Sequence, residues 1–91
     1  MVIELGGNIE LVNFDDLEPG KLVVVKKIVG SYTKKIATAA KNFKKISIEL
    51  KDKKIIGKVT IGETIHSEEA EDDNLFFALD KVLNKLEKEA K

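Results

Sequence analysis

Three lysines spaced seven residues apart form the pattern in this sequence that best suits a binding site for an anion. Lys27, Lys34 and Lys41 fall nearly in line on one side of a predicted helix, since seven residues make close to two turns. Three cations in a row can follow a phosphate backbone; the alternative is an ordinary solvated helix face. All basic residues are lysine, which lacks the planar guanidinium that reads guanine edges, so we expect diffuse phosphate contacts.

An aromatic side chain marks a second candidate surface near the C-terminus. Phe77 falls about 160° from the apolar face of the final predicted helix, beside Lys81 and Lys88. If the two helices pack side by side, both lysine-bearing faces lie on one layer and form one RNA-facing surface. The predicted RNA-binding residues are therefore Lys27, Lys34, Lys41, Phe77, Lys81 and Lys88.

Other chemistry has little support in the sequence. His66 is the only histidine and there is no cysteine, so a structural or surface role for His66 is favoured over general-base catalysis. The acidic run at 68–73 lacks the alternating ligands and central glycine of a calcium loop, and suits a solvated helix entrance better. Residues 28–36 resemble the segment around the GxxG loop of KH domains, but Thr33 replaces the second glycine within a helical pattern. We predict no enzyme activity, metal or cofactor.

Composition bounds the class of protein. Ninety-one residues fit one domain, 1–91, and 43% hydrophobic residues at zero net charge exclude a disordered chain. No apolar run can cross a membrane, and the N-terminus lacks the pattern of a signal peptide, so a cytoplasmic protein is expected.

Charge is segregated along the chain. Residues 1–20 carry a net charge of −5, residues 21–58 carry +10 and residues 59–91 carry −5. This favours a local, moderate site for a polyanion over strong, indiscriminate nucleic-acid binding. A surface rich in lysine and glutamate is also typical of heat-adapted proteins.

Periodicity predicts the elements that position these residues. Residues 2–12 form a hairpin or one bulged strand, residues 21 to about 40 an amphipathic helix, and residues 44–68 alternate with period two as three strands before a last helix. The fold class is an α+β two-layer sandwich, β(β)-α-β-β-β-α, with an antiparallel or mixed sheet and two helices on one face. Ile65 is expected to face inward; the open face is expected to carry Lys45, Ser47, Glu49, Lys51, Lys58, Thr60, Thr64 and His66.

Two segments resemble the ribosome hibernation-promoting and ribosome-associated inhibitor family. They are residues 59–66, with the Ile65-His66 strand, and residues 73–86, where Ala78, Leu79 and Asp80 precede Lys85-Leu86. Residues 3–10 are similar to its first strand and Gly-Asn turn, whereas residues 12–20 are an insertion. The resemblance implies binding to the small ribosomal subunit, with basic helix residues facing ribosomal RNA; the matching positions are Lys27, Lys34, Lys41, Lys81 and Lys88.

Two functional hypotheses follow. The first is a non-enzymatic RNA- or ribosome-binding module that modulates translation, with ribosomal or structured RNA as its partner. The second is a protein-interaction domain whose open sheet face or exposed edge strand pairs with another chain, a second copy in a homodimer included.

Overall fold

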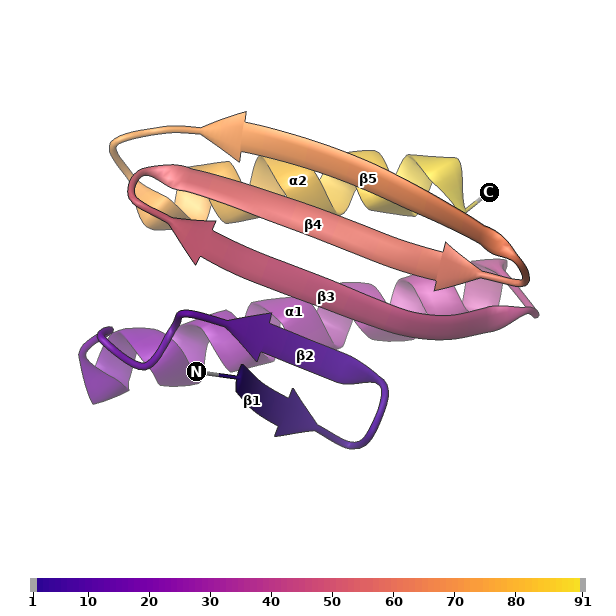
Figure 1. Ribbon diagram of the computed structural model, residues 1–91, viewed down its shortest axis with the longest axis horizontal. Helices are drawn as coiled ribbons and strands as arrows, with labels where there is room; N and C mark the ends of the chain where they lie inside the picture. The colour runs from indigo at the N-terminus through magenta and orange to yellow at the C-terminus, as the bar shows by residue number, and fades with distance from the viewer. Residues whose placement is uncertain (1, 91) are drawn as a thin grey trace.

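A five-stranded sheet is covered on one face by two helices in the computed structural model, which describes residues 2–90 (Figure 1). The elements are β1 (Val2–Leu5), β2 (Ile9–Val12), α1 (Pro19–Ala39), β3 (Phe43–Lys51), β4 (Lys54–Ile61), β5 (Thr64–Glu71) and α2 (Leu75–Glu89). The strands lie in the order β1-β2-β3-β4-β5, with β2 and β3 parallel and the other neighbours antiparallel. The predicted α+β class is confirmed, and the sheet is mixed.

Tight turns join the antiparallel strands. Residues 2–12 form a hairpin, not one bulged strand, because Gly6 and Gly7 adopt positive φ angles of 64° and 79° and reverse the chain. Two-residue turns link β3 to β4 and β4 to β5, and Gly62, with φ of 62°, opens the second of these.

The β4–β5 turn determines which side chains of β5 face the helices. Ile61 and Thr64 lie directly opposite each other, so Thr64 shares the helix-facing side of Ile61, and His66 shares that of the buried Val59. Ile65 therefore points to the open face and is 64% exposed. The predictions for Thr64, Ile65 and His66 were wrong by one step of the alternation, whereas Lys45, Ser47, Glu49, Lys51, Lys58 and Thr60 lie on the open face as predicted.

The first helix begins at Pro19, where the missing proline N–H has no helical partner. One side of α1 is buried in the core through Val25, Val29 and Ile36. The residues similar to a KH loop lie in the middle of α1 and form no loop: the Thr33 hydroxyl is buried and donates a hydrogen bond to the Val29 carbonyl oxygen at 2.7 Å. A KH-type loop is therefore absent here, in agreement with the helical pattern that disfavoured it in the sequence.

The second helix packs closely on β4. A Cβ atom added at Gly57 would lie 2.5 Å from Val82 Cγ1 and 2.9 Å from Leu86 Cδ1, so α2 crosses the sheet where β4 has no side chain. The helix begins after Asn74, whose side chain accepts a hydrogen bond from the Phe76 amide at 2.9 Å. Gly57 and this cap together set the position of α2.

The two helices run side by side in the same direction behind the sheet (Figure 1). The Tyr32 hydroxyl of α1 donates a hydrogen bond to Asp80 Oδ1 of α2 at 2.8 Å. This bond raises the pKa of Tyr32 to about 12, because losing the proton would place two negative charges together. The side-by-side packing on which the shared-surface prediction depended is present.

Candidate nucleic-acid interface

The charged side chains of α1 are all of one sign. The helix contains five lysines and no aspartate or glutamate: Lys21, Lys26, Lys27, Lys34 and Lys35. Lys27 and Lys34 are exposed, and seven helical residues separate them by roughly 10.5 Å along the axis. We call these five residues the α1 lysine surface.

The α1 lysine surface is not neutralised by the protein itself. Within residues 2–90, the salt bridges within 4.0 Å involve Lys45, Lys53, Lys54, Lys81 and His66, and none involves a lysine of α1. Lys35 instead lies over the ring of Tyr32, with Nζ 5.1 Å from the ring centroid. These cations are therefore available to an external anion.

The third lysine of the predicted row lies outside the helix. The helix ends at Ala39, and Ala40 adopts an extended conformation with φ of −116° and ψ of 104°. Lys41 is exposed in the turn that leads into β3. The prediction of three lysines in line on one helix was wrong for Lys41, although this cation extends the basic surface beyond the end of α1.

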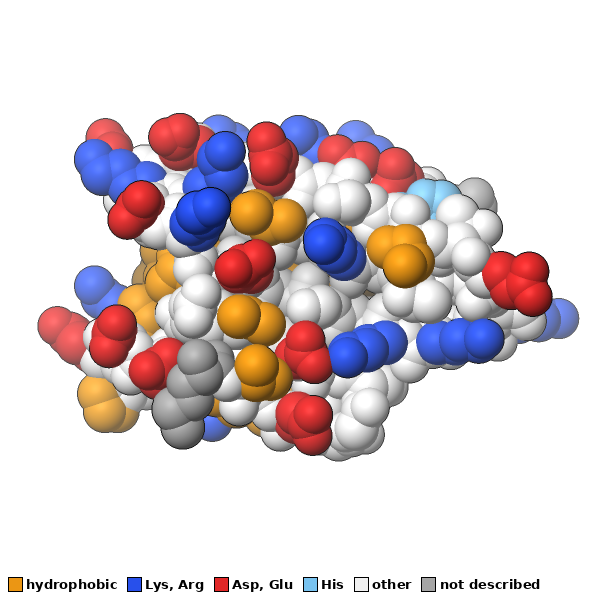
Figure 2. Space-filling model, viewed as in Figure 1, with side chains coloured by type: hydrophobic (Ala, Val, Ile, Leu, Met, Phe, Trp, Pro, Cys, Tyr) orange, Lys and Arg blue, Asp and Glu red, His pale blue; other side chains and the backbone are white. Residues whose placement is uncertain are grey.

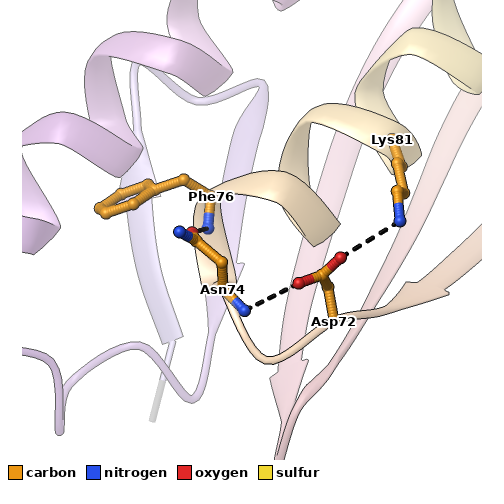
Figure 3. A network of polar contacts seen from close by, with 4 residues as sticks. All are labelled: Asp72, Asn74, Phe76 and Lys81. Atoms are coloured by element: carbon orange, nitrogen blue, oxygen red, sulfur yellow. Dashed lines mark hydrogen bonds and ion pairs between the residues drawn. The ribbon is translucent and has the colours of Figure 1, made fainter.

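The outer side of α2 is less basic than the sequence pattern suggested. Phe77 points outward, as predicted, and is 61% exposed. Lys81 Nζ lies 3.2 Å from Asp72 Oδ2, and the other oxygen of Asp72 accepts a hydrogen bond from the Asn74 amide at 2.9 Å (Figure 3). Those contacts lower the pKa of Asp72, the Asn74 amide contributing most. Of the two predicted lysines of α2, only Lys88 remains without a carboxylate within 4.0 Å in the described chain.

Acidic residues separate the two lysine-bearing sides. Asp80 lies at the junction with α1, held by Tyr32, and α2 as a whole carries three acids and three lysines. At 100° per residue, Lys27 and Lys34 lie about 140° and 160° from Tyr32 around α1, so they face away from α2. The candidate interface is thus centred on α1. Phe77 and Lys88 belong to α2 and lie on the other side of the acidic junction.

His66 has a partner within the protein. His66 Nδ1 lies 3.7 Å from Glu89 Oε2, on the helix-covered side of β5. Among residues 2–90 no group of three or more histidine, cysteine, aspartate or glutamate side chains is arranged to hold a metal ion. Neither helix in this part of the chain is long and apolar enough to span a membrane.

The open sheet face offers a more balanced surface than α1. Glu10 Oε2 lies 2.9 Å from Lys45 Nζ, and the Ser47 hydroxyl donates to Glu10 Oε1 at 3.3 Å. The hydrogen bond to Lys45 is the main cause that lowers the pKa of Glu10. Figure 2 shows acids, lysines and single hydrophobic side chains interspersed across this face, and such a mixed surface does not favour a polyanion.

Comparison with known proteins identifies a similar fold. No known family matches the sequence, and no curated protein matches it. A solved structure described as a ribosomal subunit interface protein from Coxiella burnetii is similar over 91% of this chain and 90% of its own, with a TM-score of 0.59 and 16% sequence identity. At this identity the likeness shows that the two chains share a fold.

Sequence reasoning named some lysines of this candidate interface and overlooked others. It singled out Lys27 and Lys34 from their spacing, but not Lys21, Lys26 and Lys35. The signal for these three was the absence of any acid from the whole of α1, which spacing does not detect.

Proposed function

We propose that this protein is a non-enzymatic RNA- or ribosome-binding module of the cytoplasm, which modulates translation by contacting phosphates through the α1 lysine surface and Lys41. The observation that carries the proposal is the charge of α1, a helix of 21 residues with five lysines and no acid. None of these five lysines forms a salt bridge with another residue of the described range, 2–90. An external polyanion is the partner whose charge matches this surface.

The shared fold supports the choice of the ribosome among polyanions. The Coxiella burnetii protein is described as a ribosomal subunit interface protein, and its likeness covers almost the whole of both chains. Fold alone does not determine function, so the charge of α1 is the second, independent support.

Salt dependence gives the proposal a magnitude. Each phosphate neutralised on a duplex contributes about −0.9 to the slope of log K against log salt, so contacts from Lys27, Lys34 and Lys41 contribute roughly −2.7. Raising the salt from about 50 to about 200 mM then weakens these contacts roughly 40-fold.

The experiment is co-sedimentation with small ribosomal subunits, together with titration of a structured ribosomal RNA fragment, at low and at raised salt. The variant Lys27→Gln/Lys34→Gln/Lys41→Gln should lose most of the affinity and most of the salt slope. The matched control removes three lysines of the open sheet face, Lys51→Gln/Lys54→Gln/Lys58→Gln, and should keep both. Absent binding at low salt, or equal loss in both variants, would refute the proposal.

The α2 side is tested separately. If a base stacks on Phe77, Phe77→Ala weakens RNA binding by about 1–3 kcal/mol, whereas Lys81→Gln has a smaller effect because Lys81 is already paired with Asp72. Lys88→Gln should reduce the salt slope by about one phosphate contact. Unchanged affinity in all three variants would restrict the interface to α1.

A further inference from the structure

The outer edge of β5 has unpaired backbone groups along eight residues. This strand pairs with β4 on one side and is the last in the sheet. The two-residue turn makes Ile61 and Thr64 a hydrogen-bonded pair, so alternate residues of β5 bond to β4 and the others direct N–H and C=O outward. The outward groups belong to Ile65, Ser67, Glu69 and Glu71.

The C-terminal half of β5 carries three acids, Glu68, Glu69 and Glu71, and two of them lack a lysine partner. Lys54 Nζ lies 3.8 Å from Glu69 Oε1, but within residues 2–90 no lysine lies within 4.0 Å of Glu68 or Glu71. The C-terminal half of β5 therefore presents negative charge beside an open row of backbone hydrogen-bonding groups.

Glu68 points to the side of the sheet that α2 covers, where His66 Nδ1 lies 3.7 Å from Glu89 Oε2 of α2. Partial burial and the proximity of Glu68 raise the pKa of Glu89. Negative charge therefore extends from the β5 edge to the end of α2.

These acids disfavour a second copy of this chain at the same edge. Pairing β5 with β5 would bring together two sets of Glu68, Glu69 and Glu71, and like charges facing each other across strands are destabilising. Charge on an edge strand commonly prevents such self-association. The same charge attracts a strand of opposite sign, which is the occupant that the surface selects.

We propose that the β5 edge binds an extended, lysine- or arginine-bearing segment of a partner protein, which adds to the sheet as a sixth strand. The backbone N–H and C=O groups of the partner segment would pair with those of Ile65, Ser67, Glu69 and Glu71. On the open face the partner carries basic side chains opposite Glu69 and Glu71.

The test uses three labelled nine-residue peptides and fluorescence anisotropy. The first alternates lysine and valine, the second is the same sequence with every backbone amide N-methylated, and the third alternates glutamate and valine. The second has the same charge as the first, but its backbone has no N–H to donate to β5. The proposal expects binding of the first peptide only, with slower exchange of the Ile65, Ser67, Glu69 and Glu71 amides by NMR.

Matched variants test the role of the acids. Glu68→Gln/Glu69→Gln/Glu71→Gln should weaken the lysine–valine peptide by about tenfold or more, which corresponds to at least 1.4 kcal/mol. The control Glu4→Gln/Asp16→Asn/Glu49→Gln removes the same charge away from this edge and should bind as the wild type does. Circular dichroism checks that both variants are folded.

Three outcomes would overturn the proposal. Equal binding of the N-methylated peptide would show attraction without strand pairing. Equal losses in the two triple variants would place the peptide elsewhere. Protection of the β5 amides that grows with protein concentration in the absence of peptide would identify a second copy as the occupant. None of these three results bears on the α1 lysine surface, because β5 is an edge strand of the sheet and α1 is a separate helix.

Discussion

Replacing Gly57 by alanine tests how α2 is seated on the sheet. The added Cβ would lie 2.5 Å from Val82 Cγ1, 2.9 Å from Leu86 Cδ1 and 3.2 Å from Ile48 Cδ1. All three neighbours are fully buried, so the methyl group cannot be accommodated by a side chain swinging into solvent. The helix or the strand must therefore shift.

The expected loss follows from two opposing effects. Overpacking a core costs about 1–3 kcal/mol, while the reduced freedom of the unfolded chain offsets about 0.4–1 kcal/mol. Gly57→Ala should thus lower the free energy of unfolding by about 1–2 kcal/mol and the melting temperature by roughly 5–15 °C. Urea denaturation and differential scanning calorimetry measure the two quantities.

Gly30 provides the matched control. A Cβ at Gly30 meets no atom within 4 Å, and the residue lies in the middle of α1. Gly30→Ala should stabilise the protein by about 0.5–1 kcal/mol, because alanine favours the helix. If Gly57→Ala unfolds at the same urea concentration as the wild type, the close crossing of α2 over β4 is refuted.

Three further predictions concern the polar contacts of the helices. Asn74→Ala should lower the free energy of unfolding by about 1 kcal/mol, because the Phe76 amide loses its acceptor, and Asn74→Asp should retain most of it; equal urea midpoints for wild type and Asn74→Ala would contradict this. The pKa of Tyr32 is raised to about 12, so the stability from its bond to Asp80 is complete below about pH 10 and is lost as pH rises towards 12; in alkaline urea titrations Tyr32→Phe should lack this decline, and identical curves would contradict it. The pKa of Asp72 is lowered, so its contribution is present above about pH 4 and is lost as pH falls further; Asp72→Asn should flatten the acid limb of unfolding free energy against pH, and an unchanged limb would contradict it.

Periodicity predicted the elements because it records burial. The alternation through β3 and β4 and the three- and four-residue steps of both helices arise from one buried side on each element. The strand order and the parallel pairing of β2 with β3 depend on contacts between distant segments, which no local pattern encodes.

The errors have equally local causes. The two-residue turn at Gly62 and Glu63, which the sequence indicated, puts Thr64 opposite Ile61, and the wrong facing of His66 came from not carrying the alternation of β4 through this turn. Phe14 was overlooked as a core residue because it stands alone between polar residues in the loop before α1, yet it is fully buried. The pairing of Lys81 with Asp72 depends on how β5 leads into α2, which a helix-based pattern does not describe.

The parallel pairing of β2 with β3 has a consequence for the order of folding. Strands β3, β4 and β5 are joined by two-residue turns and can pair early, whereas β2 must close residues 13–42 before it meets β3. We expect pulse-labelling hydrogen exchange to show protection of β4 amides before those of β2, and simultaneous protection would contradict this. Because α1 is the connection that closes this loop, its lysines reach their places relative to the sheet only in the slowest, least local step, after the β5 edge has already been formed.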